Sequence, residues 1–378
     1  MVLVLAASFG SLTGFYLLVS VVPLYVATGG AGETGAGLST GALMLATVVM
    51  ELAVPALLRR WGYRAGMAMG LILLGVPSAA MVISPALPLV LPACLARGAG
   101  LGIVVVAGPA LIADLVADGR RGEALGLYGV AVGVPAVVGL PLGLWLSEHA
   151  GFGPVFAVAA VVSLATLVPV TGLPSVGEPV EQHTGEPVEQ HTRVLRGLRD
   201  GGLARPVAIF AAITVAAGIL LTFLPIAVPA RSRGTAALAL LVQASAMPLA
   251  RWLAGRYGDR NGSSRLLLPA VFSAAIGTTG LIWLHNPYAL VVGAALFGIG
   301  FGAAQNATLT LMFRRAPDSG RGRVSALWNL AYDGGMGIGA VSFGLAVALV
   351  GYPAGFALTA AVLFAALIPA WLDQKRKP

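Results

Sequence analysis

Twelve apolar segments, joined by shorter polar stretches, make up most of the 378-residue chain. They span residues 2–28, 39–58, 65–84, 88–113, 124–147, 152–173, 206–228, 235–254, 266–284, 288–312, 324–347 and 353–372. Each approaches the roughly 20 residues with which an α-helix crosses the hydrocarbon of a bilayer. A helix also satisfies its backbone hydrogen bonds internally, as lipid requires. The pattern predicts an all-α membrane protein with twelve transmembrane helices and with both termini on one side.

Composition supports a membrane protein and argues against a soluble one. Hydrophobic residues make up 58% of the chain and charged residues only 10%, whereas soluble domains carry about 25% charged residues. The 51 glycines suit a helical bundle in lipid, where small residues let helices pack closely. The single cysteine, Cys94, excludes a disulfide framework within the chain.

Basic residues are unevenly divided between the two sides of the predicted bundle. Loops on one side carry 19 of the 23 Lys and Arg residues, and the opposite loops carry only Arg231 and Arg233. Basic loops stay in the cytoplasm, so we expect both termini to be cytoplasmic and the protein to lie in a bacterial inner membrane. Orientation explains the net charge of +8 better than nucleic-acid binding does.

A polar, proline-containing segment separates the sixth and seventh apolar segments. Residues 174–205 contain the direct repeat GEPVEQHT at 177–184 and 185–192. We expect a flexible cytoplasmic linker, because such polar sequences lack the apolar residues needed for a core. A functional epitope or a metal site that uses His183 and His191 is the alternative interpretation.

The halves on either side of this linker are related by a shift of 200 residues. The shift superimposes loop arginines and helix glycines without a gap; examples are Arg60 on Arg260, Gly100 on Gly300, and Gly151 on Gly351. It predicts two pseudo-symmetric six-helix bundles, residues 1–173 and 206–378. Paired six-helix repeats are one architecture of secondary transporters, in which the halves rock about a central site.

Two motifs make the chain resemble the major facilitator superfamily. Residues 255–262, GRYGDRNG, are similar to the family's G-x-x-x-D-R-x-G loop, and residues 97–102, RGAGLG, are similar to its R-x-x-G-x-G signature. The first half departs from the loop motif, because Pro55 and Arg59 replace its glycine and aspartate. The resemblance implies a gating role for these loops and for a proline in the fifth helix. The gating residues it implies are Gly255, Asp259, Arg260, Gly262, Arg59, Arg60, Gly62 and Pro141.

Two weaker matches resemble the drug/proton antiporter branch of that superfamily, which exports small solutes. They are residues 139–143, GLPLG, and residues 329–334, NLAYDG. The resemblance implies proton-coupled efflux of a small organic or amphipathic molecule by alternating access. It implies protons and the lipid bilayer as partners, no cofactor and a monomer.

Charged side chains within the spans are the candidates for proton coupling, because each costs at least about 2.5–3.5 kcal/mol to insert. They are Glu51, Arg97, Arg251 and Asp333. A carboxyl group that alternates between an apolar environment and a neighbouring arginine can bind and release a proton. We expect Asp333, Glu51 and Arg97 to couple protons, although a fixed ion pair that holds helices together is the alternative. Arg251 occupies the position equivalent to Glu51 and lies nearer the loop.

Polar and aromatic side chains on the expected cavity-lining helices are the candidates for substrate binding. They are Tyr16, Ser20, Arg97, Thr222, Gln305, Asn306, Trp328, Asn329 and Tyr332. Each taken alone is also consistent with helix packing. The adjacent amides of Gln305 and Asn306 carry the most weight, because unsatisfied amides are unfavourable in a span.

We find no pattern that indicates an enzyme. The sequence has no Ser/His/Asp set, metal cluster or G-x-x-x-x-G-K-[ST] phosphate loop, so ATP does not drive it directly. Two alternatives to proton-coupled export stay open at this point. One is an uptake carrier or uniporter for a small organic anion, which Arg97 and Arg251 would bind. The other is a receptor or scaffold that does not transport.

Overall fold

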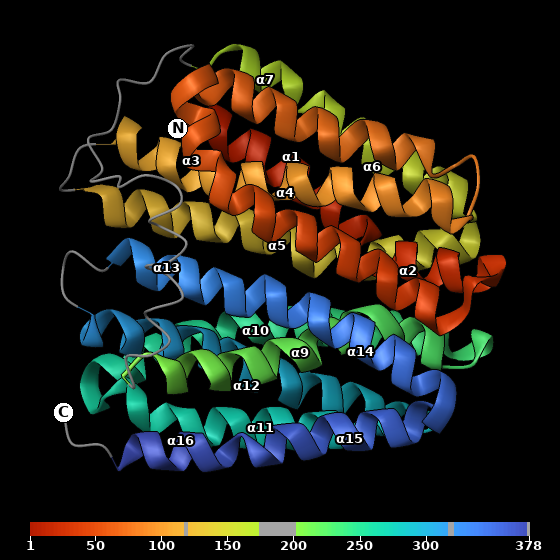
Figure 1. Cartoon of the computed structure of the whole chain (residues 1–378), viewed down its shortest axis with the longest axis vertical. Helices are drawn as coiled ribbons and strands as arrows, with labels where there is room; N and C mark the ends of the chain where they lie inside the picture. The colour runs from red at the N-terminus through yellow and green to blue at the C-terminus, as the bar shows by residue number, and fades with distance from the viewer. Residues whose placement is uncertain (117–119, 174–201, 317–320, 376–378) are drawn as a thin grey trace. The chain divides into compact units, whose positions relative to one another are not determined.

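The computed structural model describes residues 1–116, 120–173, 202–316 and 321–375. Within these ranges the regular structure is helical, without strands, and the chain forms two compact units (Figure 1). Unit 1 is Met1–Val180 and unit 2 is Glu181–Pro378. The all-α prediction is confirmed. The repeat at 177–192, with His183 and His191, lies outside the described residues.

Unit 1 is built from seven α-helices and one π-helical turn in the described ranges. They are α1 (Val2–Leu18), α2 (Val21–Val26), the π-turn η1 (Ala27–Ala31), α3 (Gly32–Ala80), α4 (Leu87–Leu115), α5 (Arg121–His149), α6 (Phe152–Ala165) and α7 (Leu167–Thr171). The helices α3 and α4 pack along each other, and α1 packs on α5 and α6. The predicted loop at 29–38 is wrong, because α3 already begins at Gly32.

Unit 2 repeats this arrangement. Its elements are α9 (Ala204–Ala227), η3 (Ala230–Ser232), α10 (Arg233–Asn261), η4 (Ser263–Leu266), α11 (Leu267–Gly280), α12 (Pro287–Arg315), α13 (Arg321–Asn329), the π-turn η6 (Leu330–Gly334), α14 (Gly335–Val350), α15 (Tyr352–Ala365) and α16 (Leu367–Gln374). Here α12 packs on α10 and α11, while α9 packs on α14. The first helix of the unit begins at Ala204, inside the stretch predicted as linker.

The helices account for the twelve predicted crossings. Nine helical stretches of the described chain are long and apolar enough to cross a membrane. One of them, Val2–Ala80, contains three predicted crossings, because only short interruptions separate its helices. The helix α11 is only 14 residues long, and η4 completes the predicted segment at 266–284.

Glycines with positive φ stand at matching turns of the two units. Gly62 (φ 74°) and Gly262 (φ 90°) separate the second and third crossings of each unit. Gly151 (φ 84°) and Gly351 (φ 76°) separate the fifth and sixth. A side chain with a Cβ rarely adopts this backbone conformation. The turn at 59–64, predicted as a loop, is therefore helical on both sides of a single glycine.

The shift of 200 residues also holds for contacts between helices. The backbone of Gly98 lies against Leu43 and that of Gly298 against Gln243; Gly100 meets Gly70, and Gly300 meets Ala270. A third pair of contacts is also equivalent in the two units, since Gly102 lies on Thr47 and Gly302 lies on Met247. A Cβ at Gly100 would lie 2.6 Å from the carbonyl oxygen of Gly70. The sequence repeat is thus a repeat of helix packing, which small residues permit.

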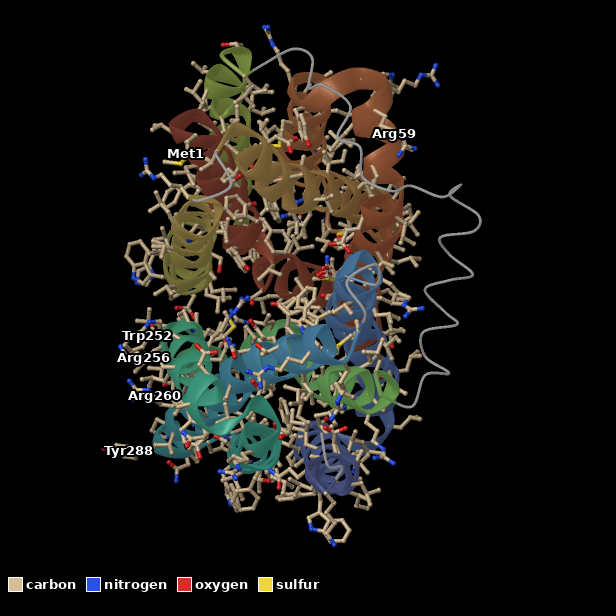
Figure 2. All side chains as sticks on the ribbon, turned by 90° about the vertical axis from the view of Figure 1, so that its left-hand side faces the viewer. Met1, Arg59, Trp252, Arg256, Arg260 and Tyr288 are labelled. Atoms are coloured by element: carbon tan, nitrogen blue, oxygen red, sulfur yellow. The ribbon has the colours of Figure 1, made fainter. Side chains whose placement is uncertain are left out.

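Large apolar side chains cover much of the outer surface of both units. Leu349 is 88% exposed and Ile83 is 78% exposed, as lipid-facing residues of a membrane protein are. Aromatic and basic side chains share one helix face in unit 2, where Figure 2 shows Trp252, Arg256 and Arg260 along an outer edge. The guanidinium carbon of Arg256 lies 4.9 Å from the centroid of the Trp252 ring. This pairing is typical of a helix at the membrane–water interface.

Candidate transport site

A hydrogen-bonded chain of polar side chains connects α10 to α12 in unit 2. The Arg251 guanidinium Nη1 donates to Gln305 Oε1 at 3.2 Å, and Gln305 Nε2 donates to Met247 Sδ at 3.3 Å. Gln305 is 2% exposed, so both polar ends of its amide are satisfied inside the unit. One turn further along α10, Gly255 leaves space for the amide of Asn306, whose Nδ2 would lie 3.2 Å from a Cβ there.

Aromatic rings from α9, α12, α13 and η6 stack beside this chain. The Phe210 and Trp328 rings stack with centroids 4.6 Å apart, and Tyr332 lies 5.6 Å from Trp328 and 5.8 Å from Phe301. Phe210 and Phe301 are buried, whereas Trp328 and Tyr332 are partly exposed. The indole Nε1 of Trp328 donates to Thr308 Oγ1 at 3.2 Å, which fixes the plane of that ring. The partly exposed rings of Trp328 and Tyr332 therefore rest on the buried rings of Phe210 and Phe301. Such an aromatic surface is suited to apolar or aromatic solutes.

The carboxyl group of Asp333 sits on the π-helical turn η6, between α13 and α14. A π-turn inserts an extra residue in a helix and is frequent at functional sites. Thr214 on α9 donates its hydroxyl to the carbonyl oxygen of Ala331 at 2.6 Å, a second bond beyond that to Ala211 in its own helix. The turn that carries Asp333 is therefore tied to α9 by a side-chain hydrogen bond. Asp333 and Tyr332 are both partly buried.

Arg97 of α4 is the most deeply buried cation in the described part of unit 1, with 1% of its surface exposed. Its Nε, Nη1 and Nη2 atoms make no hydrogen bond within the described residues. The side chain lines a cavity of about 10 Å³ between the α1–α2 break, α3 and α4. Glu51 is not its partner. Gly102 contacts Glu51 on α3, whereas Gly98 contacts Leu43, so Glu51 lies two turns, about 12 Å, further along α3.

Comparison with known proteins places the chain in a family. The sequence matches the Major Facilitator Superfamily over residues 4–340 and 231–378. The chain belongs to this superfamily. The multidrug resistance protein MdtG of Dickeya zeae is 27% identical over 284 residues, 73% of this chain and 69% of that protein. MdtG of Escherichia fergusonii is 26% identical over 287 residues, 74% and 70% of the two chains.

Solved structures share the superfamily fold. A nucleoside transporter, NupG, superimposes with a TM-score of 0.79 at 12% identity, over 98% of this chain and 99% of that chain. A D-xylose–proton symporter superimposes with a TM-score of 0.78 at 17% identity, over 100% and 98% of the two chains. The fold prediction of two six-helix bundles is confirmed, and the chain is a transporter rather than an enzyme.

The residues predicted to bind substrate fall into separate groups in the structure. In unit 2, Gln305 accepts a hydrogen bond from Arg251, Trp328 and Tyr332 belong to the aromatic cluster, and Asn306 lies against Gly255. Asn329 ends α13, and Thr222 is buried within α9. In unit 1, Tyr16 lies against the backbone of Gly139 on α5, and Ser20 is buried in the break between α1 and α2.

Of the predicted gating residues, Gly62 and Gly262 form the turns between the second and third crossings and have positive φ. Arg59, Arg60, Gly255, Asp259 and Arg260 lie in the helices that end at these turns, and Pro141 lies within α5. The side chains of Arg59, Arg60, Asp259 and Arg260 are exposed. The predicted loop around Gly255–Arg260 is wrong in detail, because these residues form the last turns of α10.

Sequence reasoning missed the residues that support the site. Met247, Phe210, Phe301, Thr308 and Thr214 gave no signal, because each is common in membrane helices. Met247 could have been found only through the shift of 200 residues, which aligns it with Thr47. Thr47 packs on α4, where its hydroxyl donates to the carbonyl oxygen of Gly98 at 3.1 Å. Met247 packs on α12 in the same way.

Proposed function

We propose that this superfamily member exports a small amphipathic organic molecule in exchange for protons. The observation that carries the proposal is the position of Asp333. Asp333 lies on a π-turn, next to Tyr332 in the sequence, and the Thr214 hydroxyl ties that turn to α9 by donating to the carbonyl oxygen of Ala331. An ionisable group in a span is a functional candidate by default, and here the group adjoins the aromatic cluster.

Protonation of Asp333 couples the gradient to the solute. The neutral carboxyl is favoured in an apolar environment and the carboxylate in a hydrated or positively charged one. A solute bound at Trp328 and Tyr332 therefore competes with the proton at Asp333. Glu51 and Arg97 serve the same coupling in unit 1. The resemblance to multidrug resistance proteins supports export of apolar solutes.

We propose that the protein lies in the bacterial inner membrane as a monomer, with both termini cytoplasmic. The two units alternate the exposure of the site between the two sides, as paired repeats of secondary transporters do. The turns at Gly62 and Gly262 hold the gating residues. A membrane potential supplies about 2.3 kcal/mol per charge for each 100 mV, which is sufficient for one proton to concentrate a solute.

A second function has a specific observation in its favour. Arg97 and Arg251 are both cationic within the spans, and an uptake carrier or uniporter for a small organic anion would use them. Arg251 already donates to Gln305 and lies beside the aromatic cluster, so it would bind a carboxylate next to an apolar body. We favour export, because the relatives that match over most of the chain are named for multidrug resistance.

Proteoliposomes with an imposed pH gradient test the choice. Purified protein is reconstituted, and a fluorescent lipophilic dye is followed with an acidic or an alkaline lumen. If the protein exchanges solute for protons, the dye accumulates in vesicles with an acidic lumen. We expect no accumulation with Asp333→Asn. Accumulation with an alkaline lumen would indicate symport, and transport indifferent to the gradient would indicate a uniporter; either result contradicts the proposal.

A further inference from the structure

The buried cation Arg97 defines a small cavity within unit 1. Ten residues line it: Leu18, Val19, Val22, Pro23, Ser39, Thr40, Leu43, Met44, Cys94 and Arg97. They come from α1, the α1–α2 break, α2, α3 and α4. Arg97 contributes the only formal charge among them, and no carboxylate lines this cavity. All three guanidinium nitrogens have less than 1 Å² of exposed surface.

A guanidinium group has five N–H donors and no acceptor. Buried charges in proteins are paired or bound to an ion, because an isolated ion is strongly unfavourable in an apolar interior. The guanidinium nitrogens of Arg97 make no hydrogen bond to the described residues, and Glu51 lies two turns further along α3. The Ser39 hydroxyl donates to the carbonyl oxygen of Ala36 at 2.7 Å, within its own helix. The lining therefore offers the guanidinium group no counter-charge.

The size of the cavity limits what can supply that charge. A volume of about 10 Å³ corresponds to about one water-sized sphere. A monatomic anion satisfies both the size and the charge, and the Cys94 thiol is a weak donor in the same wall. The carbon chain of an organic carboxylate would have to extend out of this space, on its open side, whereas a monatomic anion lies within it. The apolar side chains of Leu18, Val22 and Met44 strengthen the attraction by excluding water.

We infer that unit 1 contains a binding site for a monatomic anion such as chloride, formed by Arg97 in the cavity between the α1–α2 break, α3 and α4. Arg97 also has a proposed part in proton coupling, so the anion site is tested without any transported solute. Its occupation neutralises the buried cation and stabilises the packing of α4 on α3, where Gly98 already contacts Leu43. The bound ion also sets the charge that Arg97 presents to neighbouring helices.

Thermal unfolding of the full chain in detergent tests the site. Sodium chloride, bromide, acetate and gluconate are compared at equal ionic strength. An anion that binds only the folded state raises the unfolding temperature in a saturable manner. We expect chloride and bromide to raise it by several degrees over gluconate, with acetate giving little or no increase. Equal stability in all four salts, or stabilisation by acetate alone, would overturn the inference.

Variants locate the effect. We expect the rise in unfolding temperature caused by halide to disappear in Arg97→Gln. It persists in Arg64→Gln, which removes an exposed arginine of the same unit. Arg97→Lys keeps the charge and retains part of the rise in unfolding temperature. Crystals soaked in bromide give an anomalous peak within hydrogen-bond distance of Arg97. A halide increment that survives Arg97→Gln, or a peak only elsewhere, contradicts the assignment. The readouts need no transport, so a failure here leaves the proposed export untouched.

Discussion

Arg315 and Asp373 form a two-bond ion pair between the end of α12 and the end of α16. Nη1 and Nη2 of Arg315 lie 2.8 Å from Oδ1 and Oδ2 of Asp373, and Nη1 also donates to the carbonyl oxygen of Gly202 at 2.9 Å. Asp373 is fully buried, with 0% exposed, while Arg315 is 19% exposed. The pair ties the last helix of unit 2 to the tenth crossing and to the residues that lead into α9.

Removal of one partner from this pair is predicted to destabilise unit 2. Asp373→Asn leaves a largely buried arginine without its counter-charge, a loss of about 3–5 kcal/mol for pairs of this kind. Thermal unfolding in detergent should show a decrease of several degrees. The equivalent positions in unit 1 are Leu115 and Leu173, so the double variant Arg315→Leu, Asp373→Leu should recover most of the loss. A double variant no better than the single one would show that the ion pair itself is required.

The helix contacts of α4 and α12 predict a paired sensitivity to side chains. Gly98 and Gly298 each lie against the backbone of the neighbouring helix, so Gly98→Val and Gly298→Val force the helices apart. We expect each to lower the unfolding temperature and the yield of folded protein, by at least the 1–3 kcal/mol typical of overpacking. Gly129→Ala on α5 is the control, because a Cβ there meets nothing within 4 Å. A tolerated valine at both positions would contradict the close packing.

The bond between Arg251 and Gln305 predicts a binding phenotype. Gln305→Leu keeps the approximate volume but removes the acceptor of the arginine and the donor to Met247. Without Gln305 the Arg251 guanidinium loses the partner that positions it, so we expect KM for the transported solute to rise about tenfold, which corresponds to the loss of about 1.4 kcal/mol of binding free energy. Initial rates in proteoliposomes measure this. Ser245→Ala, which removes an exposed hydroxyl from the same helix, should leave KM unchanged; an equal effect of both variants would remove Gln305 from the site.

The hydrogen bond from Thr214 to the π-turn predicts a change in coupling. Thr214→Val keeps the shape and loses the 2.6 Å bond to the carbonyl oxygen of Ala331. We expect less solute transported per proton, measured from dye accumulation and proton flux in the same vesicles. Thr279→Val is the matched control, because among the described residues that hydroxyl bonds only to Ala275 within its own helix. Unchanged coupling in Thr214→Val would show that the turn does not need this support.

The sequence predicted the number and order of crossings because lipid demands long apolar helices. It predicted the repeat because Gly98, Gly100 and Gly102 recur 200 residues later. It could not predict that the first loop is helical from Gly32, or that one glycine at position 62 suffices for a turn. Such details depend on backbone dihedral angles, which apolar patterning does not encode.

For the candidate site, charge in a span was the informative signal. It indicated Arg97, Arg251 and Asp333, because each is unfavourable in lipid without a role. The residues that contact them could not be predicted from the sequence. Met247 and Phe210 are ordinary apolar residues, and only helix packing brings them to Gln305 and Trp328. The distance between Glu51 on α3 and Arg97 on α4 likewise depends on how the two helices are aligned against each other. The sequence of either helix alone does not give that alignment.

Proton release on solute binding tests the central claim most directly. Purified protein in weakly buffered detergent is mixed with candidate amphipathic solutes while the pH is recorded, for wild type, Asp333→Asn and Glu148→Gln. Glu148 is an exposed carboxylate at the end of α5 and serves as the control. We expect about one proton released per solute bound in wild type and in Glu148→Gln, and none in Asp333→Asn. Solute binding with no proton release, or release that persists in Asp333→Asn, would contradict a coupling proton at Asp333.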